Sequence, residues 1–470
     1  MKKLYSIPFL LLLLFFSSGL QAQRYLSEIF PNVTVSSNIE YGKNITVITG
    51  SPTMDTLRMD VYQPTGDTLS ARPLIIVAHT GSFLPVPQNG QATGTKKDSV
   101  IVDLCTRFAK RGFVVASITY RKGWNPVSSV QEVRTGTLLN AAYRGVQDMR
   151  TAVRYFRKDA AVGGNVYAID STKIVAGGLG TGGYISFGAA SLDRYAEVSL
   201  AKFINPATTT SYVDTSLSGD WNGMNARPLN IENHPGYSST IQMAFNLGGA
   251  IGDSTWLEAG DAPMVGFHCP SDPFAPYTYG AVIVPTTGDF VVNVSGTHDV
   301  IRRANMLGNN AVFTNAIFSD PFTTRANMVN NGYEGLFPFY RPTMESAPWE
   351  WWDSIYWNQV PHPTQGTFHL AGLMTNPDMS DVKSRTYIDS VMGYVSPRIV
   401  CALGLAGCVT VNRNGELSEN RIQLYPNPAG SYFMIESLEP IQQIVITDIS
   451  GKAMYSQKES GSKNVRMDCG

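Results

Sequence analysis

The sequence predicts an α/β protein: a mostly parallel, doubly wound sheet covered by helices, followed by a small β-sandwich. Three observations support this prediction. From Ile45 onward, short apolar runs alternate with longer segments of helical periodicity, which is typical of parallel strands joined by helical crossovers. A glycine-rich segment, 177–183, joins one of these runs to the next helix. From about residue 420 the pattern changes to short alternating strands without helices.

Six strands are expected in the large domain, each a short apolar run beside turn or helix signals: 57–62, 73–79, 113–119, 173–177, 241–246 and 263–267. A helix is expected at 98–110. A second, longer one is expected at 138–156, because its apolar residues recur at spacings of three and four.

Residues from about 286 to 377 are irregular and rich in Asn, Pro and aromatic side chains, and a last helix is expected from Asp378 to Tyr394. A long irregular stretch in a compact domain usually carries function, so we expect an aromatic cap here. Four of the seven tryptophans lie in residues 349–357. Their rings could contact a ligand or form the core of the cap, and both interpretations stay open. The large domain should cover 23–410, and a polar linker, 411–420, should separate it from the tail.

The N-terminus has the order of a secretory signal. Lys2 and Lys3 precede an apolar run that ends at Phe16, and small residues continue to Ala22. The apolar run is shorter than the roughly 20 residues needed to span a bilayer. We therefore expect residues 1–22 to be a cleaved signal peptide for Sec-type export to the periplasm, and no membrane span elsewhere.

Composition excludes several classes of partner. The chain has 36 basic and 37 acidic residues without a block of like charge, which argues against nucleic acid and anionic membranes as partners. No group of side chains has metal-ligand spacing, and the glycine-rich segment lacks the lysine of a P-loop, so no metal or cofactor is expected. Cys401 and Cys408 flank a short loop and could form a local disulfide or remain two buried thiols.

The main functional signal lies in residues 174–183, which read as a strand, a turn and a helix. If Gly178 and Gly182 are the glycines of a G-x-S-x-G motif, Gly180 stands in the position of the nucleophilic serine. In such an elbow the central residue lies on a strained turn that projects its hydroxyl above the sheet. Glycine has no side chain that could attack a carbonyl, so an acyl-enzyme cannot form at this position.

Together with the strand ends 79–82 and 267–277, this segment resembles the α/β-hydrolase superfamily, in particular its secreted carboxylesterase- and feruloyl-esterase-like members. The resemblance spans residues 45–310 and implies that Asp272 is the acid of a catalytic triad, although an Asp-Pro turn would explain it too. It also implies oxyanion-type backbone N–H donors at Thr80, Gly81, Ser82 and Thr181.

The resemblance further implies a triad histidine after the acid, where the sequence offers His298, His362 and His369. His298 is the first candidate, although it could equally be a cap or surface residue at the start of a helix. Related esterases tend to carry a Gly-His pair near 343–348, and this chain has none there.

The tail resembles the type IX secretion C-terminal sorting domain of Bacteroidota, through the Tyr-Pro-Asn-Pro sequence at 425–428 and the strand and turn at 444–452. The resemblance implies that the type IX secretion machinery is a partner and that the protein is secreted or at the cell surface. The tail, 421–470, is expected to be truncated because it stops at Gly470 without a further strand. A carbohydrate-binding β-sandwich is the alternative.

These observations predict a secreted, carboxylesterase-like protein of the α/β-hydrolase fold that is catalytically degenerate, a pseudoenzyme, with a pocket for an ester or glycan ligand. The first alternative is an active carboxylic-ester hydrolase with a non-standard nucleophile, Ser82 or Ser186. The second is a purely structural surface protein.

Overall fold

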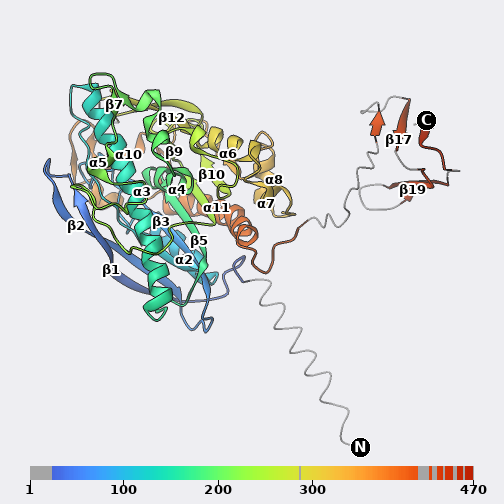
Figure 1. Cartoon of the computed structure of the whole chain (residues 1–470), viewed down its shortest axis with the longest axis horizontal. Coiled ribbons are helices and arrows are strands. Elements are labelled where there is room, and N and C mark those ends of the chain that lie inside the picture. Colours follow the sequence, from blue (N-terminus) through green and yellow to red (C-terminus); the bar gives the residue numbers. More distant parts are fainter. Residues whose placement is uncertain are drawn as a thin grey trace, which may run out of the picture. The chain divides into compact units, whose positions relative to one another are not determined.

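The computed structural model describes residues 24–284, 287–410, 423–425, 431–437, 440–447, 453–458 and 461–468. The chain divides into two compact units, Met1–Thr410 and Val411–Gly470 (Figure 1). The expected signal peptide and the linker 411–420 lie outside the described residues.

The large unit is built on an eight-stranded sheet with the order β1-β2-β4-β3-β5-β8-β10-β13. Its strands are β1 (Val33–Thr46), β2 (Thr53–Pro64), β3 (Arg72–Ala78), β4 (Val114–Ile118), β5 (Ile169–Leu179), β8 (Met243–Leu247), β10 (Met264–His268) and β13 (Leu336–Pro338). The pairs β1–β2 and β2–β4 are antiparallel, and every pair from β4 to β13 is parallel. From β3 the chain first goes to β4 on one side and then to β5 on the other. Ligands of open α/β sheets bind at such a switch point, outside the carboxyl ends of the strands.

Helices cover both faces of this sheet (Figure 1). Helices α3 (Gln131–Val162) and α4 (Thr181–Ser191) contribute to one hydrophobic core, and α2 (Ser99–Lys110) and α11 (Asp381–Ala402) to the other. Successive residues of β3 point to opposite cores: Ile76 joins the first and Ile75 the second. Because both faces are buried, the central strands are continuous apolar runs. The expected fold class is confirmed.

The six expected strands are all present, but two further strands of the sheet were not expected. The first, β1, carries many polar residues, and its pairing with β2 shifts register between Ser36 and Ile39 and between Glu40 and Gly42, which breaks its alternation. The second, β13, lies within the stretch expected to be cap. It has three residues, all buried, too few to show a period.

The remaining elements of the large unit surround the carboxyl ends of these strands or connect them. A three-stranded antiparallel sheet has the order β11-β12-β9. The elements are β6 (Ile204–Asn205), β7 (Thr210–Ser211), β9 (Ala250–Ile251), β11 (Tyr279–Ile283), β12 (Phe290–Gly296), β14 (Pro361–His362), β15 (Gly366–Thr367), α5 (Thr215–Ser218), α6 (Thr297–Met306), α7 (Ala311–Thr314), α8 (Pro321–Asn327), α9 (Ser354–Trp357), α10 (Phe368–Leu373) and the 3-10 helices Tyr195–Ser199, Ala201–Phe203 and Ser254–Trp256. In the tryptophan-rich segment, Trp349 packs against Phe339 and lines one cavity, and Trp352 lines a second cavity.

Cys401 and Cys408 form a disulfide at the end of α11, and Cys105 and Cys269 are buried thiols. No helix in the described part of the large or small unit is long and apolar enough to cross a membrane.

The small unit consists of antiparallel strands. One sheet has the order β16-β17-β20 and the other pairs β18 with β19. The strands are β16 (Gln423–Tyr425), β17 (Tyr432–Glu436), β18 (Gln443–Thr447), β19 (Ala453–Lys458) and β20 (Asn464–Asp468). Ile435, Ile444, Val465 and Met467 form a core of its own. Residues 426–430, 448–452 and 469–470 of the expected sorting motif lie outside the described residues.

Because the small unit has its own core, deletion of residues 419–470 should leave the melting temperature of the large unit within about 2 °C of that of the mature protein. The measurement is calorimetry of the two chains in the same buffer. A fall of many degrees would show that the two units stabilise each other.

Candidate functional site

Gly180 forms the turn between β5 and α4. Its φ and ψ angles are 51° and −117°, and its N–H donates to the Leu247 carbonyl of β8 at 2.8 Å. A positive φ favours glycine, because a side chain at such an angle meets the backbone. The structure therefore forms a sharp strand-to-helix elbow with Gly180 at its tip.

Two further glycines let α4 lie close to the sheet. A Cβ atom added at Gly178 would lie 1.8 Å from the Gly182 carbonyl oxygen, and one added at Gly182 would lie 2.0 Å from the Ala78 oxygen of β3. Any larger residue at either position would push α4 away. Both glycines of the motif are thus required by the contact between helix and sheet.

The space for a side chain at position 180 is occupied by Thr80. A Cβ atom added at Gly180 would lie 2.3 Å from Thr80 Oγ1, well inside a normal contact distance. Thr80 follows β3, so the loop expected to supply oxyanion donors also fills the position of the nucleophile. A serine at position 180 therefore has to displace the Thr80 side chain.

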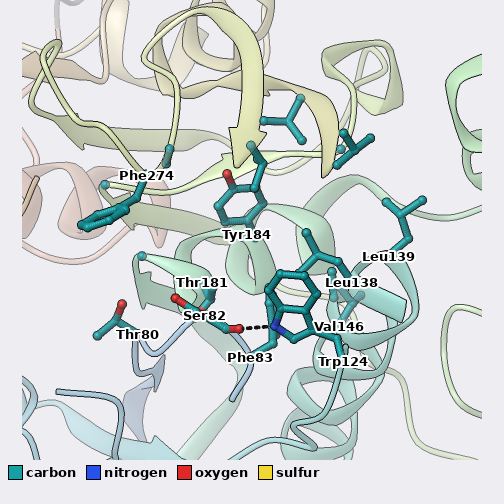
Figure 2. A pocket seen from close by; sticks show the side chains of 18 of the residues that line it. Thr80, Ser82, Phe83, Trp124, Leu138, Leu139, Val146, Thr181, Tyr184 and Phe274 are labelled. Atoms are coloured by element: carbon teal, nitrogen blue, oxygen red, sulfur yellow. Dashed lines mark hydrogen bonds between the residues drawn. The ribbon is translucent and has the colours of Figure 1, made fainter. Parts of the chain in front are cut away.

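The loop after β3 is strained and held from several sides. Ser82 and Phe83 have φ angles of 52° and 53°, which non-glycine residues rarely adopt. Trp124 Nε1 donates to the Ser82 carbonyl at 2.7 Å (Figure 2). The Tyr120 hydroxyl donates to the His79 carbonyl at 3.0 Å and lies 3.0 Å from Thr181 Oγ1. Strain maintained in this way is common at functional sites.

The elbow and this loop expose free backbone donors. Among the described residues, no acceptor takes the N–H of Ser82 or of Thr181, the first residue of α4. The first N–H groups of a helix have no partner within the helix. These two groups could therefore bind a ligand oxygen.

Gly180 lies on the wall of a cavity of about 160 Å³ at the carboxyl ends of the strands. Thr80, Ser82, Thr181 and Asp272 line it as well, so the structure brings five of the predicted site residues together. Gly81 and His298 do not line it. The rest of the wall is mainly apolar, and Figure 2 shows Leu138 and Leu139 of α3 on the side opposite Thr80.

Asp272 lies on the loop after β10. Its side chain is only 3% exposed, and its Oδ1 accepts the N–H groups of Phe274 and Ala275 at 2.7 and 3.3 Å. Burial raises the pKa of Asp272 to about 7, and these two hydrogen bonds only partly oppose it. The same bonds also form the turn that an Asp-Pro pair predicts.

The histidine nearest to Asp272 is His268, the last residue of β10. Its Nε2 lies 3.7 Å from Asp272 Oδ2, too far for a hydrogen bond, and 3.0 Å from the Ala275 carbonyl, to which it donates. Burial lowers the pKa of His268 to about 4, so the ring is neutral. His268 does not line the cavity.

The three histidines proposed as a base lie elsewhere. His298, the second residue of α6, has its Nδ1 2.9 Å from Asp299 Oδ1, and its ring contacts Tyr277 and Tyr333. His362 Nδ1 accepts the N–H groups of Thr364 and Gln365, and His369 Nδ1 accepts Trp352 Nε1–H at 3.2 Å. None of the three lines the cavity over Gly180.

Sequence reasoning missed Glu350. This residue follows β13 and lines the cavity from the segment where the expected histidine is absent. Its Oε2 accepts the Thr93 hydroxyl at 3.0 Å. Burial, with smaller contributions from the carboxyl groups of Asp98 and Asp272, raises the pKa of Glu350 to about 8. The available signal was a single acidic residue between two tryptophans, at Trp349 and Trp351.

No cluster of His, Cys, Asp or Glu able to hold a metal ion occurs within 24–284, 287–410 and the described tail strands.

The strand order, the elbow after β5 and a family match define the large unit as an esterase-like α/β-hydrolase domain. Residues 59–282 match the family model described as BD-FAE, and residues 423–469 match the secretion system C-terminal sorting domain. The chain therefore combines a BD-FAE domain with a type IX sorting tail, which makes it a secreted or cell-surface protein that interacts with the type IX secretion machinery.

Solved structures of an esterase are similar to the chain. Native esterase 2 of the planctomycete Thermogutta terrifontis is 15% identical over 82% of this chain and 96% of its own, with a TM-score of 0.38. The same esterase phosphorylated by paraoxon is 20% identical over 53% and 74% of the two chains, with a TM-score of 0.32. Similarity at this level says nothing about the chemistry of this chain. A comparison with curated proteins finds no match.

The contact between position 180 and Thr80 predicts the behaviour of restored serines. Gly180→Ser should lower the free energy of unfolding by about 1–3 kcal/mol, through overpacking and strain. Adding Thr80→Gly should recover much of this loss. Neither variant should hydrolyse p-nitrophenyl acetate, because no histidine lines the cavity. Thr80→Gly alone is the control. Strong activity of Gly180→Ser by itself would show that a native histidine already serves as base.

The raised pKa of Asp272 predicts a pH-dependent effect on stability. The ordinary pKa of an aspartate is about 4, so below that pH the carboxyl group is protonated in both states and its burial does not lower the free energy of unfolding. As the pH rises from about 4 to about 7, the unfolded state loses this proton first, and the free energy of unfolding falls. Asp272→Asn should therefore stabilise the protein, by roughly 2 kcal/mol more at pH 8.5 than at pH 5.5. Urea unfolding at both pH values measures this difference. An equal effect at the two pH values would place the pKa of Asp272 in its ordinary range.

Proposed function

We propose that this chain is a secreted, esterase-like protein that binds an ester or glycan ligand in the cavity over Gly180 and does not cleave it through an acyl-enzyme. One observation carries the proposal: the nucleophile position is a glycine, and the Thr80 hydroxyl occupies the space beside it. A serine hydrolase needs an activated hydroxyl at this point.

The absence of a positioned base supports the same conclusion. Hydrolysis by a serine triad requires a histidine within hydrogen-bond reach of the nucleophile. No histidine is among the described residues that line the cavity, and the histidine nearest to Asp272 donates to a carbonyl. On this proposal Asp272 is a triad acid without the base that it would orient.

The cavity itself supports binding. The free N–H groups of Ser82 and Thr181 can donate hydrogen bonds to a ligand oxygen, and the apolar wall can cover a hydrocarbon group. Neither feature depends on a nucleophile.

One observation favours the second candidate, an active hydrolase with a non-standard nucleophile. Ser82 lines the cavity, and no hydrogen bond of its hydroxyl occurs within the described residues. Ser186 does not support this candidate, because its fully buried hydroxyl donates to the carbonyls of Gly183 and Phe245 at 3.0 and 2.9 Å.

Labelling with a fluorophosphonate separates the two candidates. We expect no covalent adduct by intact-mass spectrometry of the mature protein, because no activated hydroxyl faces the cavity. An active serine esterase treated in parallel is the positive control. An adduct that maps to Ser82 and disappears in Ser82→Ala would establish the active hydrolase instead. An adduct at any other serine that lines the cavity would contradict the proposed function as well.

A further inference from the structure

Two carboxyl groups and no basic side chain line the cavity over Gly180. Asp272 enters from the loop after β10 and Glu350 from the segment after β13. No Lys, Arg or His is present among the described residues of this wall. An anionic ligand would therefore lose its hydration without gaining a cationic partner, which is costly.

Each carboxyl group keeps one oxygen without a hydrogen bond to the described protein residues. Asp272 uses Oδ1 for two backbone N–H groups, and Glu350 uses Oε2 for the Thr93 hydroxyl. In the part of the chain that the structure describes, neither Asp272 Oδ2 nor Glu350 Oε1 has a hydrogen bond. Both oxygens are therefore available to a ligand.

The remainder of the wall determines the shape and polarity of the ligand. It is formed largely by apolar side chains from several elements, among them Leu138 and Val146 of α3 and Val292 and Val294 of β12. The volume of about 160 Å³ resembles that of apolar cavities of about 150 Å³ that hold one benzene molecule. Glu350 also lines a neighbouring cavity of about 220 Å³, whose wall includes His362.

The groups around the two carboxyls favour their protonated forms. Near Asp272 are His268 and Cys269 of the β10 strand end and Tyr184 of α4, and burial keeps all three neutral. Near Glu350 is Asp98, whose own pKa is raised by burial. Lys122 is the basic group coupled to Asp98, and it does not line the cavity.

At pH 6 Asp272 and Glu350 are therefore mostly neutral and can donate a hydrogen bond, since burial raises their pKa values to about 7 and about 8. At pH 9 both are charged. They then offer no proton to a carbonyl and place negative charge in an apolar cavity.

We propose, on the basis of the non-cleaving pocket above, that Asp272 and Glu350 make the cavity selective for uncharged, compact apolar molecules with a hydrogen-bond acceptor, such as an ester carbonyl, over the corresponding free acids. The carboxyl groups donate to the acceptor, and the apolar wall covers the hydrocarbon part.

Three probes of matched shape test this selectivity: methyl 3-phenylpropanoate, 3-phenylpropanoate and 3-phenylpropylammonium. Isothermal titration calorimetry of the mature protein at pH 6 should show binding of the ester and at least tenfold weaker binding of the two ions. At pH 9 the affinity for the ester should fall at least tenfold. Preference for the acid or the amine, or no binding by any probe, would overturn the inference.

Variants assign the pH dependence to the two side chains. The double variant Asp272→Asn, Glu350→Gln keeps a neutral donor at every pH, so its affinity for the ester should be the same at pH 6 and pH 9. Asp299→Asn, which changes a carboxyl group away from the cavity wall, should keep the wild-type pH dependence. A double variant that still loses affinity at pH 9 would contradict the assignment.

The same samples distinguish failure of the inference from failure of the proposed function. Release of 3-phenylpropanoate from the ester, followed by chromatography, would show turnover and contradict the proposed function. Altered selectivity without turnover would contradict only the roles given to Asp272 and Glu350.

Discussion

The close approach of α4 to the sheet is the constraint on which the site depends. With no Cβ atoms at Gly178 and Gly182, the first turn of the helix contacts the carbonyl of Ala78 directly. This contact determines where the elbow turns, where Gly180 has a positive φ and where Thr181, the first residue of the helix, lines the cavity. The architecture of an esterase elbow therefore persists whether or not residue 180 can react.

Burying the carboxyl groups of the cavity lowers the stability of the folded protein, and folding alone gives no reason for placing them there. Asp272 and Glu350 are buried in apolar surroundings, and each has an oxygen without a hydrogen bond to the described protein residues. A carboxyl group with a raised pKa lowers the stability of the folded state at neutral pH. The proposed ligand binding gives a reason for keeping these groups. Burial raises their pKa values, and a protonated carboxyl group can donate a hydrogen bond to a ligand. The Thr80 hydroxyl lies in the space that a side chain at position 180 would occupy.

Much of the fold could be predicted from local patterns. The central strands are continuous apolar runs because both faces of the sheet are buried. The helix α3 has apolar residues at helical spacing because one side of it is buried. Both patterns are visible in the order of the residues. Strand β13 could not be predicted in this way, because three residues carry no period. Glu350 was missed for a related reason: its place in the cavity depends on β13 being the last strand of the sheet, which a long irregular segment does not reveal.

By itself, the sequence determined the fold class, the glycine at the elbow and the acid after β10, because each is a matter of residue identity in a local pattern. Only the tertiary structure decided which groups meet. It placed the Thr80 hydroxyl against position 180 and joined Glu350 to the same cavity as Asp272. In the folded chain, His268 donates a hydrogen bond to the Ala275 carbonyl. The physical reason is that pairwise distances and desolvation arise from segments far apart in the chain, whereas sequence patterns report only the neighbours of each residue.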